Sequence, residues 1–72
     1  MPNRTTESQA DALDTYLEAR VDDPKTVLSS RKAESVVNRL TRMIANFRDG
    51  TGTKTAAQIR TAINRSIPLN RN

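Results

Sequence analysis

The sequence of 72 residues has no cysteine, histidine or tryptophan, and it has one tyrosine and one phenylalanine. Without cysteine there is no disulfide, and without either cysteine or histidine a structural zinc site is not expected. Histidine and cysteine are also among the side chains that most often act as catalytic bases and nucleophiles. We therefore expect a protein that is not an enzyme, with no catalytic residues, no metal and no cofactor.

Long apolar runs are missing as well. No stretch approaches the ~20 consecutive apolar residues that a membrane-spanning helix needs. The polar opening, MPNRTTESQ, lacks the apolar segment of a secretory signal peptide. Together with the absence of cysteine, this predicts an intracellular, cytoplasmic protein that makes no membrane contact. If the protein binds DNA, we expect it to be associated with the nucleoid.

Acidic side chains are scarce in the later part of the chain, and none follows Asp49. Residues 1–23 contain six acids and two bases, which gives −4, whereas residues 24–72 contain two acids and ten bases, which gives +8. The sum is the formal net charge of +4. Such a distribution indicates an acidic or phosphate-bearing partner for the later two-thirds of the chain.

The segment from Ser30 to Arg48 has the clearest pattern in the sequence. Apolar residues recur there at steps of three and four, which places them on one side of an α-helix. These residues are Ala33, Val36, Val37, Leu40, Met43, Ile44 and Phe47. Basic residues fall on another side, and we call this set the basic ridge: Arg31, Lys32, Arg39 and Arg42. The pattern predicts a helix that packs on a core and presents the ridge to solvent.

Two further helices are expected on either side of this segment, over residues 6–20 and 56–66. Thr6 or Ser8 is positioned to cap the first, and Thr55 with Gln58 has the spacing of a capping box at the start of the third. Ser29 or Ser30 is expected to cap the middle helix, which Gly50 should end in the left-handed conformation. One short helical turn is expected at 24–28, where Pro24 follows Asp23.

The predicted fold is therefore a small all-α domain of three helices spanning residues 6–67, with flexible tails at 1–5 and 68–72. A chain of this length buries only a small core. We expect homodimerisation or a partner protein to supply additional stability.

The third helix carries polar side chains opposite its apolar residues: Gln58, Thr61, Asn64 and Arg65, with Arg60 at the flank. Asparagine and glutamine can bond adenine at two atoms, and arginine can do the same with guanine. Residues 31–66 thus resemble a helix-turn-helix protein, and this resemblance implies that the third helix reads bases. The connector from Asp49 to Lys54 is longer than the usual turn of that motif. The alternative is an ordinary amphipathic helix.

The connector between the second and third helices contains two glycines, threonines and Lys54. It does not match the Walker phosphate-binding loop, because Thr53 rather than glycine precedes the lysine and a helix rather than a strand precedes the loop. Lys54 and the free amides of the following helix still suit one backbone phosphate. The alternative is a simple connector between two capped helices.

The leading hypothesis is a small duplex-DNA-binding regulator or accessory factor, with duplex DNA favoured over RNA. The aromatic residues Tyr16 and Phe47 lie on apolar helix sides and are expected to be buried, which argues against base stacking on single strands. The alternative is a protein-interaction module, such as a virus-encoded inhibitor that docks on a nucleic-acid-processing complex. Its contact surface for a basic protein or a second copy would be Glu7, Asp11, Asp14 and Glu18. The other interpretation of these acids is a solvated face that attracts the basic helices of their own chain.

Overall fold

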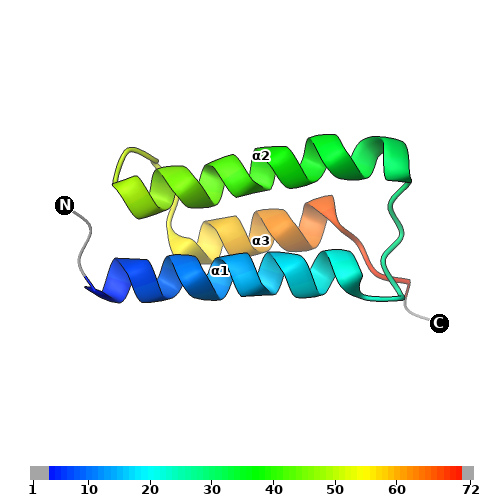
Figure 1. Cartoon of the computed structure of the whole chain (residues 1–72), viewed down its shortest axis with the longest axis horizontal. Helices are drawn as coiled ribbons and strands as arrows, with labels where there is room; N and C mark the ends of the chain where they lie inside the picture. Colours follow the sequence, from blue (N-terminus) through cyan, green and yellow to red (C-terminus); the bar gives the residue numbers. More distant parts are fainter. Residues whose placement is uncertain (1–3, 71–72) are drawn as a thin grey trace.

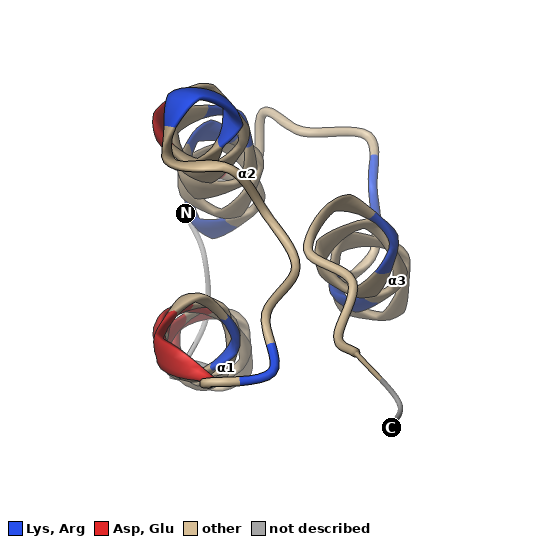
Figure 2. Cartoon of the chain, turned by 90° about the vertical axis from the view of Figure 1, so that its right-hand side faces the viewer, with Lys and Arg blue, Asp and Glu red and all other residues tan. Residues whose placement is uncertain are grey.

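The computed structural model describes residues 4–70, which form three helices: α1 (Arg4–Asp22), α2 (Ser30–Asp49) and α3 (Ala56–Ser66). The helices lie side by side along the long axis of the molecule (Figure 1). Viewed along that axis, they occupy the corners of a triangle, and each helix contacts both others (Figure 2). The predicted all-α, three-helix domain is confirmed. No helix within residues 4–70 is long and apolar enough to cross a membrane.

One hydrophobic core fills the space between the three helices. Its buried members are Ala10, Leu13, Leu17, Leu40, Ile44, Ile59, Ile63 and Ile67. In α2 the buried residues are Leu40 and Ile44, at the centre of the predicted apolar side, so the opposite side of this helix is turned to solvent. Tyr16 and Phe47 are half-buried at the edge of the core rather than fully buried as expected, because their large rings pack against it from outside.

The residues that begin and end α2 and α3 act as predicted. Ser29 is the N-cap of α2, and its side chain accepts a hydrogen bond from the backbone amide of Lys32. Gly50 ends this helix in the left-handed conformation, with φ of 77°. At the start of α3, Thr55 and Gln58 form a complete capping box. These caps satisfy backbone groups that a helix leaves without partners at its ends.

The linker between α1 and α2, residues 23–29, and the ends of the chain differ from the sequence-based prediction. Residues 23–26 form a turn closed by the hydrogen bond from the Thr26 amide to the Asp23 carbonyl (3.0 Å), and no helical turn follows at 24–28. Helix α1 also extends beyond residues 6–20 at both ends, so Arg4 is helical. The remaining residues of the expected tails, 1–3 and 71–72, lie outside the described residues.

Residues 67–70, which we call the C-terminal strap, run beside the linker instead of forming a free tail. The Val27 amide donates to the Pro68 carbonyl (2.9 Å), and the Asn70 amide donates to the Lys25 carbonyl (2.7 Å). Both segments are extended, so their backbone groups have no partners within a helix. The bonds between the segments supply those partners. The strap therefore joins the end of α3 to the linker between α1 and α2.

The expected helix-turn-helix-like arrangement of the last two helices is not confirmed. The two helices of that motif cross at a steep angle. Helices α2 and α3 instead lie alongside each other in the bundle (Figure 1). Residues 50–55 separate them, and this connector is long enough for α3 to fold back beside α2.

Candidate nucleic-acid interface

The basic ridge lies on the outward side of α2. This helix stands at one corner of the triangle, and its apolar side packs on α1 and α3 (Figure 2). All four ridge residues are consequently exposed to solvent. The ridge is thus positioned by the sharp amphipathic pattern of α2 itself.

Within residues 4–70, the only ion pairs involve Arg48, which is not a ridge residue. Its guanidinium binds Asp11 at 2.9 Å and Asp14 at 2.7 Å, and so connects α2 to α1. The hydrogen bond to Asp11 is the main cause that raises the pKa of Arg48, and the charges of both carboxylates add to it. Two of the acids on α1 are therefore occupied by a cation from their own chain, while the ridge has no such partner.

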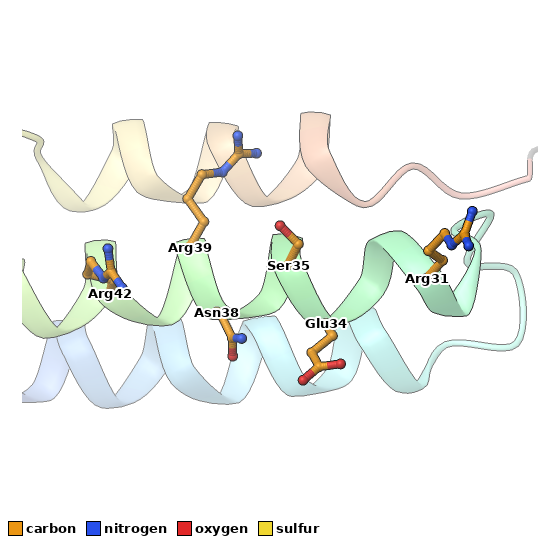
Figure 3. A pocket seen from close by; sticks show the side chains of 6 residues that line it. All are labelled: Arg31, Glu34, Ser35, Asn38, Arg39 and Arg42. Atoms are coloured by element: carbon orange, nitrogen blue, oxygen red, sulfur yellow. The ribbon is translucent and has the colours of Figure 1, made fainter.

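Two ridge arginines have side chains without any hydrogen-bond partner in the described part of the chain, namely Arg31 and Arg42. Arg39 differs, because its Nη2 donates to Ser66 Oγ at 3.0 Å. Figure 3 shows this side chain directed toward α3, whereas Arg31 and Arg42 stand near the two ends of the viewed surface. Arg31 and Arg42 are therefore the ridge arginines without a partner in the described chain, while Arg39 is exposed and keeps its remaining N–H donors.

The ridge arginines line a shallow hollow of about 500 Å³ on the surface of α2. Its lining also includes Ser35, Asn38 and one acid, Glu34 (Figure 3). Three basic side chains against one carboxylate leave this surface with a positive charge. Lys54 is exposed, but it lines a separate hollow with the residues of the 50–55 connector. The structure therefore brings Arg31, Arg39 and Arg42 together and places Lys54 apart from them.

The side chains of α3 that were expected to contact bases form bonds within the protein. Gln58 Oε1 accepts a hydrogen bond from the Thr55 amide at 2.8 Å as part of the capping box. Thr61 Oγ1 donates to the Ala57 carbonyl at 3.0 Å. Both polar groups thus have partners on their own helix, which weakens the prediction that they read bases.

The remaining α3 residues face α1 more closely than the pattern indicated. Asn64 Oδ1 accepts a hydrogen bond from the Tyr16 hydroxyl, and Arg60 lies over the Tyr16 ring at 5.0 Å from its centroid. This face of α3 borders a groove against α1, so its polar side chains complete the packing of two helices. Arg65 alone among the five is exposed without a partner within residues 4–70.

The four acids predicted as a partner-binding surface do not behave as one set. Asp11 and Asp14 bind Arg48, as the alternative of attraction within the chain had proposed. Glu7 and Glu18 are exposed and form no ion pair in the described chain. Red segments in Figure 2 show that the acids of α1 lie on its side away from α3.

Ser35 lies on the ridge side of the predicted helix but was given no role in binding, and Asn38 was not recognised as part of that side. The signal was present, since Arg31, Ser35, Asn38 and Arg42 follow one another at steps of four, three and four residues. That spacing keeps them on one side of a helix. The base-contacting role was assigned to α3 because its polar face was judged without its packing against α1.

No family model, curated protein or solved structure matches this chain in the three comparisons with known proteins.

Proposed function

We propose that this protein binds duplex DNA through the basic ridge of α2 and acts as a small regulatory or accessory factor. The observation that carries this proposal is the state of Arg31 and Arg42. Both are exposed on a corner helix, and neither has a carboxylate or other hydrogen-bond partner among residues 4–70. A guanidinium in this state is free to form charge-assisted hydrogen bonds with phosphate oxygens.

The physics of phosphate binding favours such a surface. Each phosphate that a cation neutralises releases condensed counterions, so affinity falls steeply as salt rises. Four ridge cations would give a slope of log affinity against log salt of roughly −3 to −4. A duplex fits better than a single strand because stacking requires exposed aromatic faces. Here Tyr16 is covered by Arg60, and Phe47 is half-buried.

The test is fluorescence anisotropy with a random-sequence duplex at about 50 mM and 200 mM salt, where the two conditions should differ clearly in affinity. The double variant Arg31→Ala/Arg42→Ala should bind at least about tenfold more weakly at the lower salt, since two phosphate contacts are removed. Circular dichroism of the variant should match that of the original protein, because both side chains are exposed.

The matched control, Lys25→Glu, lowers the net charge by the same two units at a position outside the ridge. Lys25 lies in the turn after α1 and is exposed. This variant should keep most of its affinity. Equal losses in the two variants would show that net charge alone governs binding, and unchanged binding by Arg31→Ala/Arg42→Ala would remove the ridge from the proposal.

A further inference from the structure

We propose that α2, rather than α3, is the base-reading helix, and that Asn38 contacts a base edge in the major groove of duplex DNA. This inference rests on the proposed function and adds sequence recognition to it. It concerns one line of exposed residues, which we call the outer stripe: Arg31, Ser35, Asn38 and Arg42. All four line the same hollow on α2.

The outer stripe has dimensions that suit a groove. Arg42 lies eleven positions after Arg31, which corresponds to about 16 Å along a helix. This length covers about five base pairs at 3.4 Å each. Figure 3 shows an arginine toward each end, with Ser35 and Asn38 between them on opposite sides of the midline. The stripe thus offers two cationic ends for phosphates and a neutral polar centre for bases.

The position of α2 in the bundle leaves it able to enter a groove. The major groove of B-DNA is about 12 Å wide and admits one α-helix. Helix α2 stands at a corner of the triangle, with α1 and α3 both behind its outer side (Figures 2 and 3). In a flat layer the middle helix would be shielded by its neighbours, whereas each helix of this triangle presents an outer side, and on α2 that side carries the outer stripe.

The fold offers no structural use for the side chain of Asn38. It is exposed in the middle of α2, and its side chain has no hydrogen-bond partner within residues 4–70. Asparagine is less favourable than alanine at an interior helix position. Its amide matches the N6 and N7 atoms of adenine in the major groove. Asn64, the asparagine of α3, already accepts a hydrogen bond from Tyr16.

The flanks of the stripe set the direction from which DNA approaches. Arg39 points toward α3, while Glu34 points toward α1 (Figure 3). Phosphates are attracted on the first side and repelled on the second. The backbone of one strand would therefore run along the α2–α3 side. Asn38, which points toward α1 in Figure 3, would then face the base edges in the groove beyond that backbone.

The experiment is selection from a random duplex library by the full chain, with sequencing of the bound pool. The original protein should enrich a motif of about five base pairs that contains an adenine at one position. The Asn38→Ala variant should lose the preference at that position alone and keep its affinity for random duplex within about twofold. Alanine favours the helix more than asparagine does, so this variant should not fail to fold.

Thr41→Ala is the control, because Thr41 is also exposed on α2 but lies on its side toward α1 and does not line the hollow. It should leave the motif unchanged. A motif that persists in Asn38→Ala would overturn the role of this residue. Binding without any enriched motif would overturn base reading while the proposed function stands. Absence of binding at any salt would end both.

Discussion

Gly50 ends α2 because its backbone adopts φ of 77°, a conformation that residues with a Cβ atom disfavour. Its amide then bonds back to carbonyls of the last helical turn, on Asn46 and Phe47. A Cβ built on Gly50 meets no other atom within 4 Å. Any penalty for a side chain at this position is therefore conformational and does not come from a clash.

We expect Gly50→Ala to lower the free energy of unfolding by about 1–2 kcal/mol, since alanine is strained in the left-handed region. Gly50→Asn should lose less than half as much, because asparagine tolerates this region better. Urea denaturation of the three proteins, followed by circular dichroism, measures the difference. Equal stability of the alanine variant and the original protein would contradict the assigned role of the glycine.

The ion pairs of Arg48 could not be predicted from the pattern of residues in α2. The apolar periodicity of α2 defines which side is buried, and from it the basic ridge follows. Whether a cation at the margin of that side meets a carboxylate depends on how α1 lies against α2. Asp11 and Asp14 are more than 30 residues away in sequence from Arg48, so no local pattern indicates the two ion pairs.

At the scale of whole elements, the C-terminal strap holds one end of the bundle together. Arg20 Nε donates to the Ile67 carbonyl at 2.7 Å, and Thr26 Oγ1 donates to the Arg20 carbonyl. With the backbone bonds between residues 25–27 and 68–70, these contacts tie the end of α1, the linker and the end of α3 to one another. Of the residues that form these contacts, only Arg20 lies within a helix. Helix packing alone therefore does not fix the positions of the linker and the strap.

A chain shortened to end at Ile67 should lose about 1–2 kcal/mol of unfolding free energy, because the backbone bonds at Val27 and Lys25 lose their partners. Urea denaturation measures this change. Val27→Ala tests whether side-chain contacts are responsible instead. Val27 is 57% exposed, so the substitution should shift stability by less than about 0.5 kcal/mol. A shortened chain as stable as the full one would show that the strap contributes nothing to the free energy of unfolding.

The helices could be predicted from sequence, while the strap and the occupied face of α3 could not. Helix periodicity and caps are local, and residues such as Ser29, Gly50 and Thr55 act within four positions of themselves. The strap joins two extended segments about 40 residues apart, and neither has the alternation of a strand. Similarly, the engagement of Asn64 by Tyr16 depends on the rotation of α3 against α1.

For the molecule as a whole, charge is separated between helices. Helix α1 contains five acids, whereas α3 contains Arg60 and Arg65 and no acid. The basic ridge lies on the outward side of α2, away from the other two helices. In Figure 2 the red segments gather mainly on α1 and the blue ones mainly on α2 and α3. A phosphate-bearing ligand would therefore be attracted to the α2–α3 side of the molecule and repelled from α1.

Two single substitutions with the same change in net charge test whether this arrangement or the total charge controls DNA binding. Glu34→Gln removes the one acid of the hollow, and Glu18→Gln removes an exposed acid of α1. The Debye length is about 8 Å at 0.15 M salt, so only charges close to the ligand act strongly. Glu34→Gln should then raise affinity for random duplex by about two- to threefold, and Glu18→Gln by less than about 1.5-fold.

The difference between the affinity gains of these two variants should become smaller at about 0.01 M salt. The Debye length is then about 30 Å, so the charges of the α1 acids also act on the ligand. Anisotropy titrations of the original protein and both variants at the two salt concentrations give the six affinities. Equal gains at 0.15 M would mean that overall charge, rather than the surface of α2, attracts the duplex. A larger gain for Glu18→Gln would place the contact on α1 and reverse the proposed orientation.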